Sequence, residues 1–407
     1  MIPAKKILRA LVCASTFGCA FLPPTIRAQD AIDRLDMQAH AAYDSQDYAT
    51  AIKLWTNELK LDPTNATVAF NRASAYELSD QPDKAIDGYT EAIRLDPKDP
   101  QAHLSRAQLY ARQWQAAATK GAAGDAKGAA DDPDAQKMIA DYTELIRLKP
   151  DADSYSDRAA AYRTLHQPDK AIADYNTMMQ LDPKAWQPYQ YRGATYFESG
   201  QWDKAVDDFT QVLKMNPGDD VAASTCLMRG TVYLQQKEWD KALDDATASL
   251  KVNPDNAEAL SLRGNAEAGR GDYQKAIDDY HKLTAADPDY AEAYNAEAWL
   301  YATCPDEKFR NGTKALELAQ KACELTQWKD VSFIDTLAAA YAENGKFDDA
   351  VKYQKQAVDA SRTERDTEWM TADLASRIPL YEQKQPYREE KKQSNTTPPQ
   401  TPAPSPH

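Results

Sequence analysis

The fold is decided by residues 186–219, which read WQPYQYRGATYFESGQWDKAVDDFTQVLKMNPGD. Apolar side chains recur three or four positions apart in both halves, from Tyr189 to Tyr196 and again up to Phe209. This spacing indicates two amphipathic helices. Gly200 interrupts the pattern between them, and Pro217 ends the second because proline cannot continue a helix. The stretch therefore predicts one helix hairpin.

The same order of residues returns along the chain. Prolines that close such a unit recur at one fixed spacing in three pairs: Pro63 and Pro97, Pro183 and Pro217, and Pro254 and Pro288. A constant period of this kind indicates stacked units, none of which can bury its apolar face alone. Small residues such as Gly193 and Ala205 allow the two helices of a hairpin to approach closely. Large ones such as Phe209 fill the space between hairpins.

This arrangement of small residues, aromatic residues and closing prolines resembles the tetratricopeptide repeat (TPR) family. The resemblance implies an all-α, right-handed solenoid of about nine helix hairpins with a C-terminal capping helix. The repeats are expected near residues 32–65, 66–99, 100–151, 152–185, 186–222, 223–256, 257–290, 291–330 and 331–364. An Ala/Gly-rich insertion, read as a flexible loop, occupies 115–134, the capping helix 365–390, and a disordered Pro/Thr-rich tail 391–407. Residues 298–341 are similar to the terminal units of exported bacterial members.

The first 28 residues have the pattern of a secretory signal peptide. Lys5, Lys6 and Arg9 precede an apolar run that ends at Leu22, and Ala28 offers a small residue at the cleavage point. We therefore expect a periplasmic or secreted protein. An uncleaved signal that anchors the chain in a membrane, lipidation at Cys19, and a cytoplasmic location are the alternatives. No later stretch is apolar enough to predict a membrane span.

Charge and cysteine content exclude several classes of function. The formal net charge is −15, and removal of 1–28 takes away four basic residues and no acidic one. A chain this acidic repels phosphate backbones, so nucleic acid is not expected as a partner. Cys226, Cys304 and Cys323 follow the signal without the spacing of a zinc site or disulfide framework. Free thiols are expected, and a Cys304–Cys323 bridge stays open.

No residue is expected to act in catalysis, to bind a cofactor or to ligate a metal. The five histidines have no second histidine or cysteine at metal-ligand spacing, and the short motifs of hydrolases, nucleotide-binding proteins and metalloproteases are missing from the sequence. The sequence therefore predicts that the protein is not an enzyme.

Arginines and aspartates recur at fixed places in the repeats. The arginines, in the first helices, are Arg72, Arg106, Arg158, Arg192, Arg229 and Arg263. The aspartates, in the second helices, are Asp141, Asp174, Asp208, Asp245 and Asp279. We expect a structural ladder of Arg–carboxylate pairs, because arginine suits partly buried bidentate pairs. The alternative is a basic stripe that grips acidic ligands.

In the family, the first helix of each repeat lines a concave groove. This resemblance places eight residues on the inner face: Tyr43, Phe70, Glu77, Gln190, Phe197, Leu234, Asn265 and Trp299. Some members clamp a C-terminal carboxylate with Lys and Asn, whereas the matching positions here are Phe70 with Ser74 and Gln190 with Ala194. An extended or helical peptide held by aromatic and amide contacts fits better. The alternative is that these aromatic residues only pack between repeats.

The resemblance and the signal pattern together predict a protein–protein interaction scaffold of the periplasm or cell envelope. Its partner would be a protein or peptide, and the sequence leaves its oligomeric state open. An accessory subunit or holding factor of an envelope assembly or secretion machine is the alternative. An enzyme with an unrecognised site is more remote, because no stretch outside the repeats is as long as a catalytic domain of about 100 residues.

Overall fold

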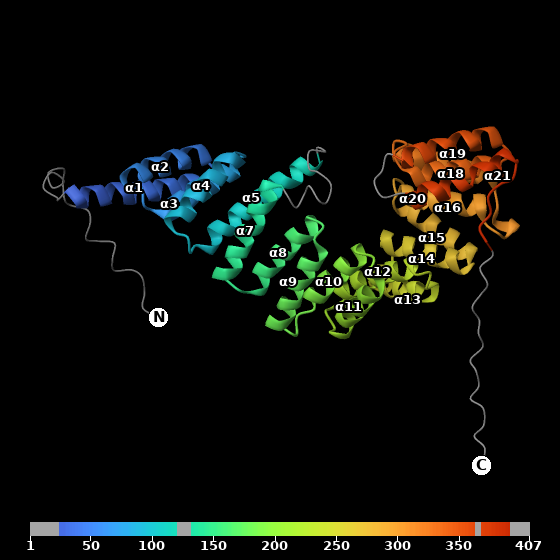
Figure 1. Cartoon of the computed structure of the whole chain (residues 1–407), viewed down its shortest axis with the longest axis horizontal. Helices are drawn as coiled ribbons and strands as arrows, with labels where there is room; N and C mark the ends of the chain where they lie inside the picture. Colours follow the sequence, from blue (N-terminus) through green and yellow to red (C-terminus); the bar gives the residue numbers. More distant parts are fainter. Residues whose placement is uncertain (1–23, 120–131, 363–367, 391–407) are drawn as a thin grey trace, which may run out of the picture. The chain divides into compact units, whose positions relative to one another are not determined.

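The computed structural model describes residues 24–119, 132–362 and 368–390 (Figure 1). Over these residues the chain is built of helices joined by short turns, and none of them lies in a β-strand. The chain divides into two compact units, residues 1–188 and 189–407. Each unit is described by itself below.

The described residues of unit 1 form four helix hairpins. Its helices are α1 (Pro24–Asp44), α2 (Tyr48–Leu61), α3 (Ala66–Leu78), α4 (Pro82–Leu95), α5 (Pro100–Thr119), α7 (Pro133–Leu148), α8 (Ala152–Thr164) and α9 (Pro168–Leu181). Consecutive helices pair as α1 with α2, α3 with α4, α5 with α7 and α8 with α9. The second helix of each of the first three hairpins also packs against the first helix of the next one. Stacking of this kind buries the apolar face that a lone hairpin leaves open.

Unit 2 continues the same pattern and adds a C-terminal cap. Its helices are α10 (Gln187–Glu198), α11 (Trp202–Lys214), α12 (Asp219–Gln235), α13 (Trp239–Val252), α14 (Ala257–Arg270), α15 (Tyr273–Ala286), α16 (Ala291–Thr303), the short η1 (Glu307–Phe309), α17 (Gly312–Leu325), α18 (Val331–Glu343), α19 (Phe347–Ser361), α20 (Glu368–Ser376) and α21 (Ile378–Glu382). The first helices of neighbouring hairpins contact one another, α12 with α14, α14 with α16 and α16 with α18. They form one continuous face of the unit. The all-α fold of stacked helix hairpins is therefore confirmed.

Local sequence explains where the helices begin and end. Asn65 and Asn256 accept hydrogen bonds from the backbone N–H groups of Val68 and Ala259, at 3.2 and 2.8 Å, and so cap the N-termini of α3 and α14. Asp96, which precedes Pro97, is extended at φ −131° and ψ 93°. The ring of a following proline disfavours helical backbone, so α4 ends before Asp96.

The hairpins close tightly because small residues occupy the crossing points. A Cβ atom on Gly264 would lie 2.7 Å from a ring carbon of Tyr280, and one on Gly88 would lie 2.8 Å from Cβ of Ala73. Both distances are too short for two carbon atoms in contact. Glycine at these positions therefore permits the close approach that the stack requires.

Two features of the chain differ from the sequence-based expectation. The predicted insertion, 115–134, is helical at both described ends, because α5 continues to Thr119 and α7 begins at Pro133. The predicted single capping helix, 365–390, is two short helices, α20 and α21, followed by a non-helical segment. Pro379 explains the break between them, because proline belongs in the first turn of a helix, where its missing N–H has no partner to lose.

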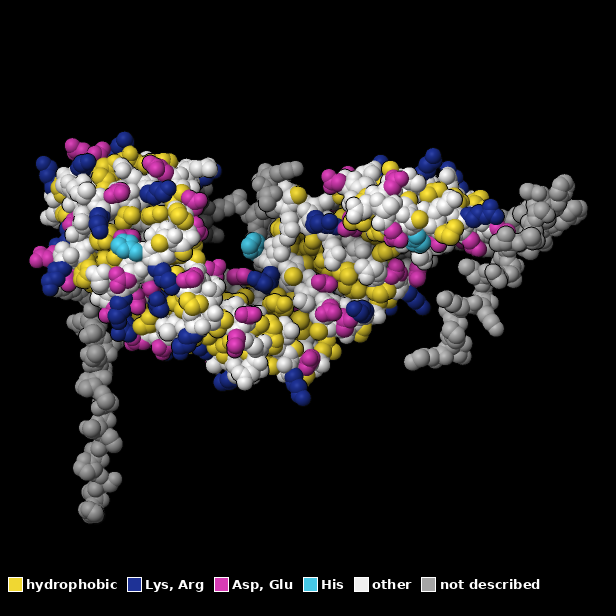
Figure 2. All heavy atoms as spheres, turned by 180° about the vertical axis from the view of Figure 1, so that it is seen from behind, with side chains coloured by type: hydrophobic (Ala, Val, Ile, Leu, Met, Phe, Trp, Pro, Cys, Tyr) yellow, Lys and Arg dark blue, Asp and Glu magenta, His cyan; other side chains and the backbone are white. Residues whose placement is uncertain are grey.

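The N-terminal signal and the C-terminal tail lie outside the described residues, except that 24–28 belong to the first turns of α1. Among the helices that are described, none combines the length and the apolar character needed to cross a bilayer. Figure 2 shows acidic and basic side chains interspersed on the face it presents, so the excess negative charge is spread rather than gathered there.

Candidate functional site

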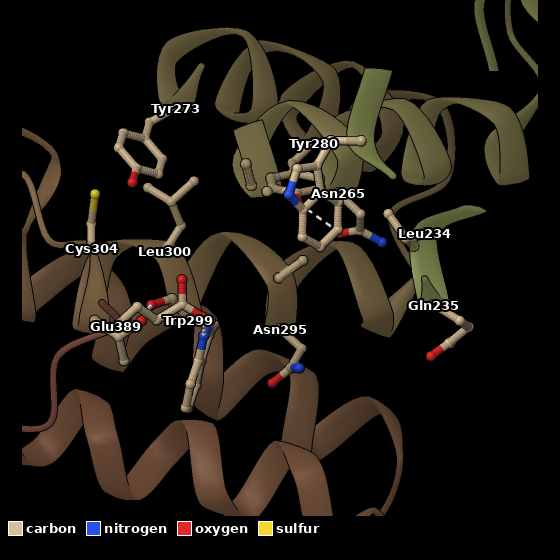
Figure 3. A pocket seen from close by; sticks show the side chains of 15 residues that line it. Leu234, Gln235, Asn265, Tyr273, Tyr280, Asn295, Trp299, Leu300, Cys304 and Glu389 are labelled. Carbon is tan, nitrogen blue, oxygen red and sulfur yellow. Dashed lines mark hydrogen bonds between the residues drawn. The ribbon is translucent and has the colours of Figure 1, made fainter. Parts of the chain in front are cut away.

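A cavity of about 340 Å³ opens on the face of unit 2 formed by α12, α14 and α16 (Figure 3). Aromatic rings make much of its wall, namely those of Trp239, Tyr273, Tyr280 and Trp299. Gly269 lets Trp239 lie flat against α14, because a Cβ atom there would come within 2.6 Å of the indole ring. Burial raises the pKa of Tyr273 to about 12, so its hydroxyl is neutral at physiological pH. Aromatic side chains therefore form much of the lining that a ligand would meet.

Two asparagines supply the polar groups of the cavity. Asn265 lies between Tyr280 and Leu234 (Figure 3), and its Oδ1 accepts a hydrogen bond of 2.7 Å from the Tyr280 hydroxyl. This contact fixes the amide and leaves its Nδ2 hydrogens without a partner among the described residues. Asn295 instead has an unpaired acceptor, because its buried Oδ1 receives no hydrogen bond within the described structure. An unpaired buried acceptor costs about 1–3 kcal/mol. The two asparagines thus hold an unused donor at the cavity wall and an unpaired acceptor buried beside it.

A short C-terminal strap, residues 386–389, closes one end of the cavity. The backbone N–H of Glu389 donates to the carbonyl of Thr303 at 3.0 Å, and Trp299 Nε1 donates to Glu389 Oε1 at 2.9 Å. The Arg388 guanidinium donates to the carbonyl of Ala302 at 3.1 Å. Both carbonyls lie in the last turn of α16, where helix carbonyls have no partner within the helix. The strap satisfies them and brings a carboxylate to the cavity wall.

Arg377, at the junction of α20 and α21, holds the strap in place from behind. Its buried guanidinium lies 4.8 Å from the ring centre of Tyr387 and 5.5 Å from that of Trp299. It also donates to Asp335 at 3.3 Å, and Gln354 donates to the same carboxylate at 2.7 Å. Burial raises the pKa of Asp335, although Arg377 opposes that shift. The cap and the strap are therefore tied together by one buried polar cluster.

The arginines and aspartates predicted to pair are brought together in five places. The pairs are Arg106 with Asp141, Arg158 with Asp174, Arg192 with Asp208, Arg229 with Asp245 and Arg263 with Asp279, each through two hydrogen bonds of 2.6 to 2.9 Å. Arg106, Arg158 and Arg229 also donate to threonine hydroxyls of the preceding hairpin, those of Thr90, Thr143 and Thr210. These contacts support the structural ladder rather than a basic stripe that grips acidic ligands.

Arg72 departs from the expected ladder. It donates to Glu91 at 2.8 Å rather than to an aspartate. The place of the aspartate is taken by Gly88, whose missing side chain allows α4 to pack against Ala73. Glu91, nearly one turn further along α4, supplies the carboxylate instead.

Polar residues that were not predicted extend the ladder at both ends. His103 lies buried and contacts Asp141, with Nδ1 at 3.0 Å from Oδ1. Glu297 stands one repeat length after Arg263, in the place of an arginine, and lies 2.7 Å from Nε2 of His281. The regular repeat spacing was a signal that could have identified Glu297.

The eight predicted groove residues have different surroundings. Leu234, Asn265 and Trp299 line the cavity. The five others do not line it, and each has contacts of its own. Tyr43 shares a hydrogen bond with Ser74, Glu77 accepts hydrogen bonds from Tyr89 and Arg112, and Gln190 donates one to Thr225. Phe70 lies against the ring of Tyr89, and Phe197 packs beside a core cluster.

Asn295 and Glu389, both in the cavity wall, were missed from the sequence. Asn295 lies one helical turn before Trp299, a spacing that places the two on one side of α16. Glu389 carried no signal, because it was expected to lie in a capping helix.

The remaining predicted chemistry concerns thiols and metals. Cys226, Cys304 and Cys323 are buried and unbridged. Burial raises the pKa of Cys226 to about 11 and that of Cys323 to about 12, so these thiols are protonated at physiological pH. Over residues 24–119, 132–362 and 368–390, no cluster of three or more His, Cys, Asp or Glu has the arrangement of a metal site.

Curated proteins with similar sequences match only part of this chain. Tetratricopeptide repeat protein 28 of Homo sapiens is 30% identical over 131 residues, which cover 32% of this chain and 5% of that protein. The heat-shock protein cognate co-chaperone sgt12 of Aspergillus fumigatus is 32% identical over 142 residues, which cover 32% of this chain and 41% of that protein. The chain thus matches less than half the length of either relative.

Solved structures with the same kind of fold are more distant. A tetratricopeptide repeat protein from Parabacteroides merdae shares 16% identity at a TM-score of 0.43, over 66% of this chain and 97% of that one. Yeast Tom70 shares 13% identity at a TM-score of 0.43, over 87% of this chain and 97% of that one.

Family models described as tetratricopeptide repeat match residues 37–100, 158–228, 227–291, 262–303 and 332–364. These ranges cover more than half of the chain and coincide with the helix hairpins described above. The chain belongs to the tetratricopeptide repeat family.

Proposed function

We propose that this protein is an interaction scaffold that binds an extended segment of a partner protein on the face formed by α12, α14 and α16. The observation that carries this proposal is the pair of amides in the cavity wall that lack a partner, with a donor at Asn265 and a buried acceptor at Asn295. A peptide unit brings one N–H donor and one C=O acceptor, which are the two groups that these asparagines lack.

The strap supports the same proposal. Its non-helical backbone lies against the last turn of α16, with a main-chain hydrogen bond to Thr303 and a ring contact of 5.7 Å between Tyr387 and Trp299. Extended peptides are commonly recognised through main-chain hydrogen bonds combined with side-chain pockets. A partner segment entering the cavity beside the strap would use contacts of this type.

The role that follows is binding without catalysis. The signal pattern in residues 1–28 supports a site of action in the periplasm or cell envelope, and an accessory subunit or holding factor of an envelope machine is the second form of the proposal. The acidic net charge of −15 disfavours nucleic acid as the partner.

Selection from a displayed library of short random peptides on the immobilised full chain tests the proposal. We expect enriched peptides to bind the unmodified protein and to lose about tenfold or more in affinity to Asn295→Arg, because an arginine side chain fills the cavity. Gln274→Arg, on the exposed surface of α15, is the matched control and should leave binding unchanged. Enriched peptides that bind Asn295→Arg as tightly as the unmodified chain would contradict this site.

A further inference from the structure

We propose that the cavity receives a lysine or arginine side chain of the bound segment. The inference rests on the proposed function and specifies the chemistry of the same site. It begins from the charge of the wall. Of the residues that line the cavity, all of them described, Glu389 is the one that carries a formal charge at neutral pH.

The Glu389 carboxylate keeps capacity for a second partner. Its Oε1 accepts from Trp299 Nε1 at 2.9 Å, and a carboxylate has two oxygens with about four acceptor positions. Arg388 of the strap and Arg377, which contacts Tyr387, are engaged elsewhere, because Arg388 pairs with Glu343 and Arg377 pairs with Asp335 and Asp373. The Glu389 carboxylate therefore lies in the cavity wall without an ion pair to a cation of the described residues.

The aromatic walls suit a cation as well as the carboxylate does. Trp239, Tyr273 and Trp299 present rings to the cavity, and a ring face attracts an ammonium or guanidinium group. Unit 2 already places a cation over aromatic rings beside this cavity, because the Arg377 guanidinium lies over the rings of Trp299 and Tyr387. The indole of Trp299 thus already attracts one cation of this chain.

The rest of the site and the chain agree with a basic ligand. The amides of Asn265 and Asn295 are suited to the peptide backbone, which leaves Glu389 and the rings for the side chain. The net charge of −15 attracts basic segments at long range. An acidic side chain at this position would meet the Glu389 carboxylate directly, and an apolar one would leave its charge unpaired.

A set of blocked heptapeptides, identical except for a central Lys, Arg, Gln, Glu or Leu and labelled with fluorescein, tests the proposal by fluorescence anisotropy on the full chain. We expect the Lys and Arg peptides to bind about tenfold more tightly than the Gln peptide, as a charge-assisted contact should provide. The Glu peptide should bind more weakly still. Raising the salt concentration should reduce the difference, because ions screen the attraction.

Glu389→Gln is the decisive variant, because the amide oxygen keeps an acceptor for Trp299 while the charge is removed. We expect the preference for Lys and Arg over Gln to disappear in this variant, with the affinity for the Gln peptide unchanged. Glu390→Gln, which changes the exposed neighbouring residue, is the matched control and should keep the preference.

The outcomes separate this inference from the proposed function. Equal binding of all five peptides to the unmodified chain, abolished by Asn295→Arg, would refute the basic side chain and retain peptide binding. A preference for Lys and Arg that survives Glu389→Gln would refute the role of this carboxylate. Failure of every peptide to bind would overturn both proposals.

Discussion

At the scale of single residues, Glu267 makes the stability of unit 2 depend on pH. Burial, reinforced by the charge of Asp279, raises the pKa of Glu267 to about 7, and its Oε2 has no hydrogen-bond partner within the described structure. The folded state therefore holds a proton that the unfolded chain releases near pH 4.5. The stability contributed by this group is complete below pH 4.5 and is lost as the pH rises through about 7.

We expect Glu267→Gln to remove this dependence. At pH 8 the variant should be more stable than the unmodified chain by about 1–3 kcal/mol, whereas at pH 5 the two should differ little. Urea unfolding followed by circular dichroism at both pH values measures the difference. Glu258→Gln, an exposed change on the same helix, is the control. An equal gain at pH 5 and pH 8 would show that proton uptake by Glu267 is not the cause.

Contacts between side chains could be predicted from the sequence where both residues occupy a fixed position in the repeat. Arg192 and Asp208 lie at fixed places in the two helices of one hairpin, so register alone places their side chains on facing helices. The pairing of Arg72 with Glu91 could not be foreseen, because Gly88 takes the place of the aspartate and the carboxylate comes from nearly a turn away. Of the two cavity asparagines, Asn265 was predicted as a groove residue and Asn295 was not, since an unpaired amide is a property of packing.

At the scale of elements, helices were predictable and the strap was not. Prolines and capping residues set helix ends by local rules, which the sequence displays. Residues 386–389 have no such local rule, because their conformation depends on carbonyls of α16, which lies far earlier in the chain. Pro379 was a sign in the sequence that the capping helix is interrupted, because proline cannot lie in the interior of a continuous helix without breaking it.

The strap itself is testable as an element. Tyr387→Ala removes the ring that lies against Trp299 and Arg377, so the strap should detach more often from α16. We expect the amide of Glu389, which donates to Thr303, to exchange its hydrogen about tenfold faster. Hydrogen–deuterium exchange read by mass spectrometry measures this, with peptides from α8 in unit 1 as the internal reference. Unchanged exchange at Glu389 would mean that Tyr387 does not hold the strap.

At the scale of the whole molecule, the stack of hairpins makes stability a local property. Within each unit, hairpins pack against their neighbours in sequence, so the free energy of a unit is close to a sum of hairpin terms and nearest-neighbour terms. A globular domain with one shared core would instead pass a local defect to all its parts. This architecture also explains how five successive helices, α12 to α16, can supply the cavity wall together with a strap that comes from much later in the sequence.

Gly264→Ala provides the test, because the added Cβ would come 2.7 Å from the buried ring of Tyr280 and force α14 and α15 apart. Overpacking of this kind costs about 1–3 kcal/mol. We expect faster hydrogen exchange in α14 and α15, a smaller effect in α13 and α16, and none in α3 and α4 of unit 1. Gln274→Ala, on the exposed side of α15, should leave the whole pattern as it was. If exchange rose by the same factor in every helix of both units, the chain would unfold as one cooperative body, and the argument that each hairpin depends mainly on its neighbours would be wrong.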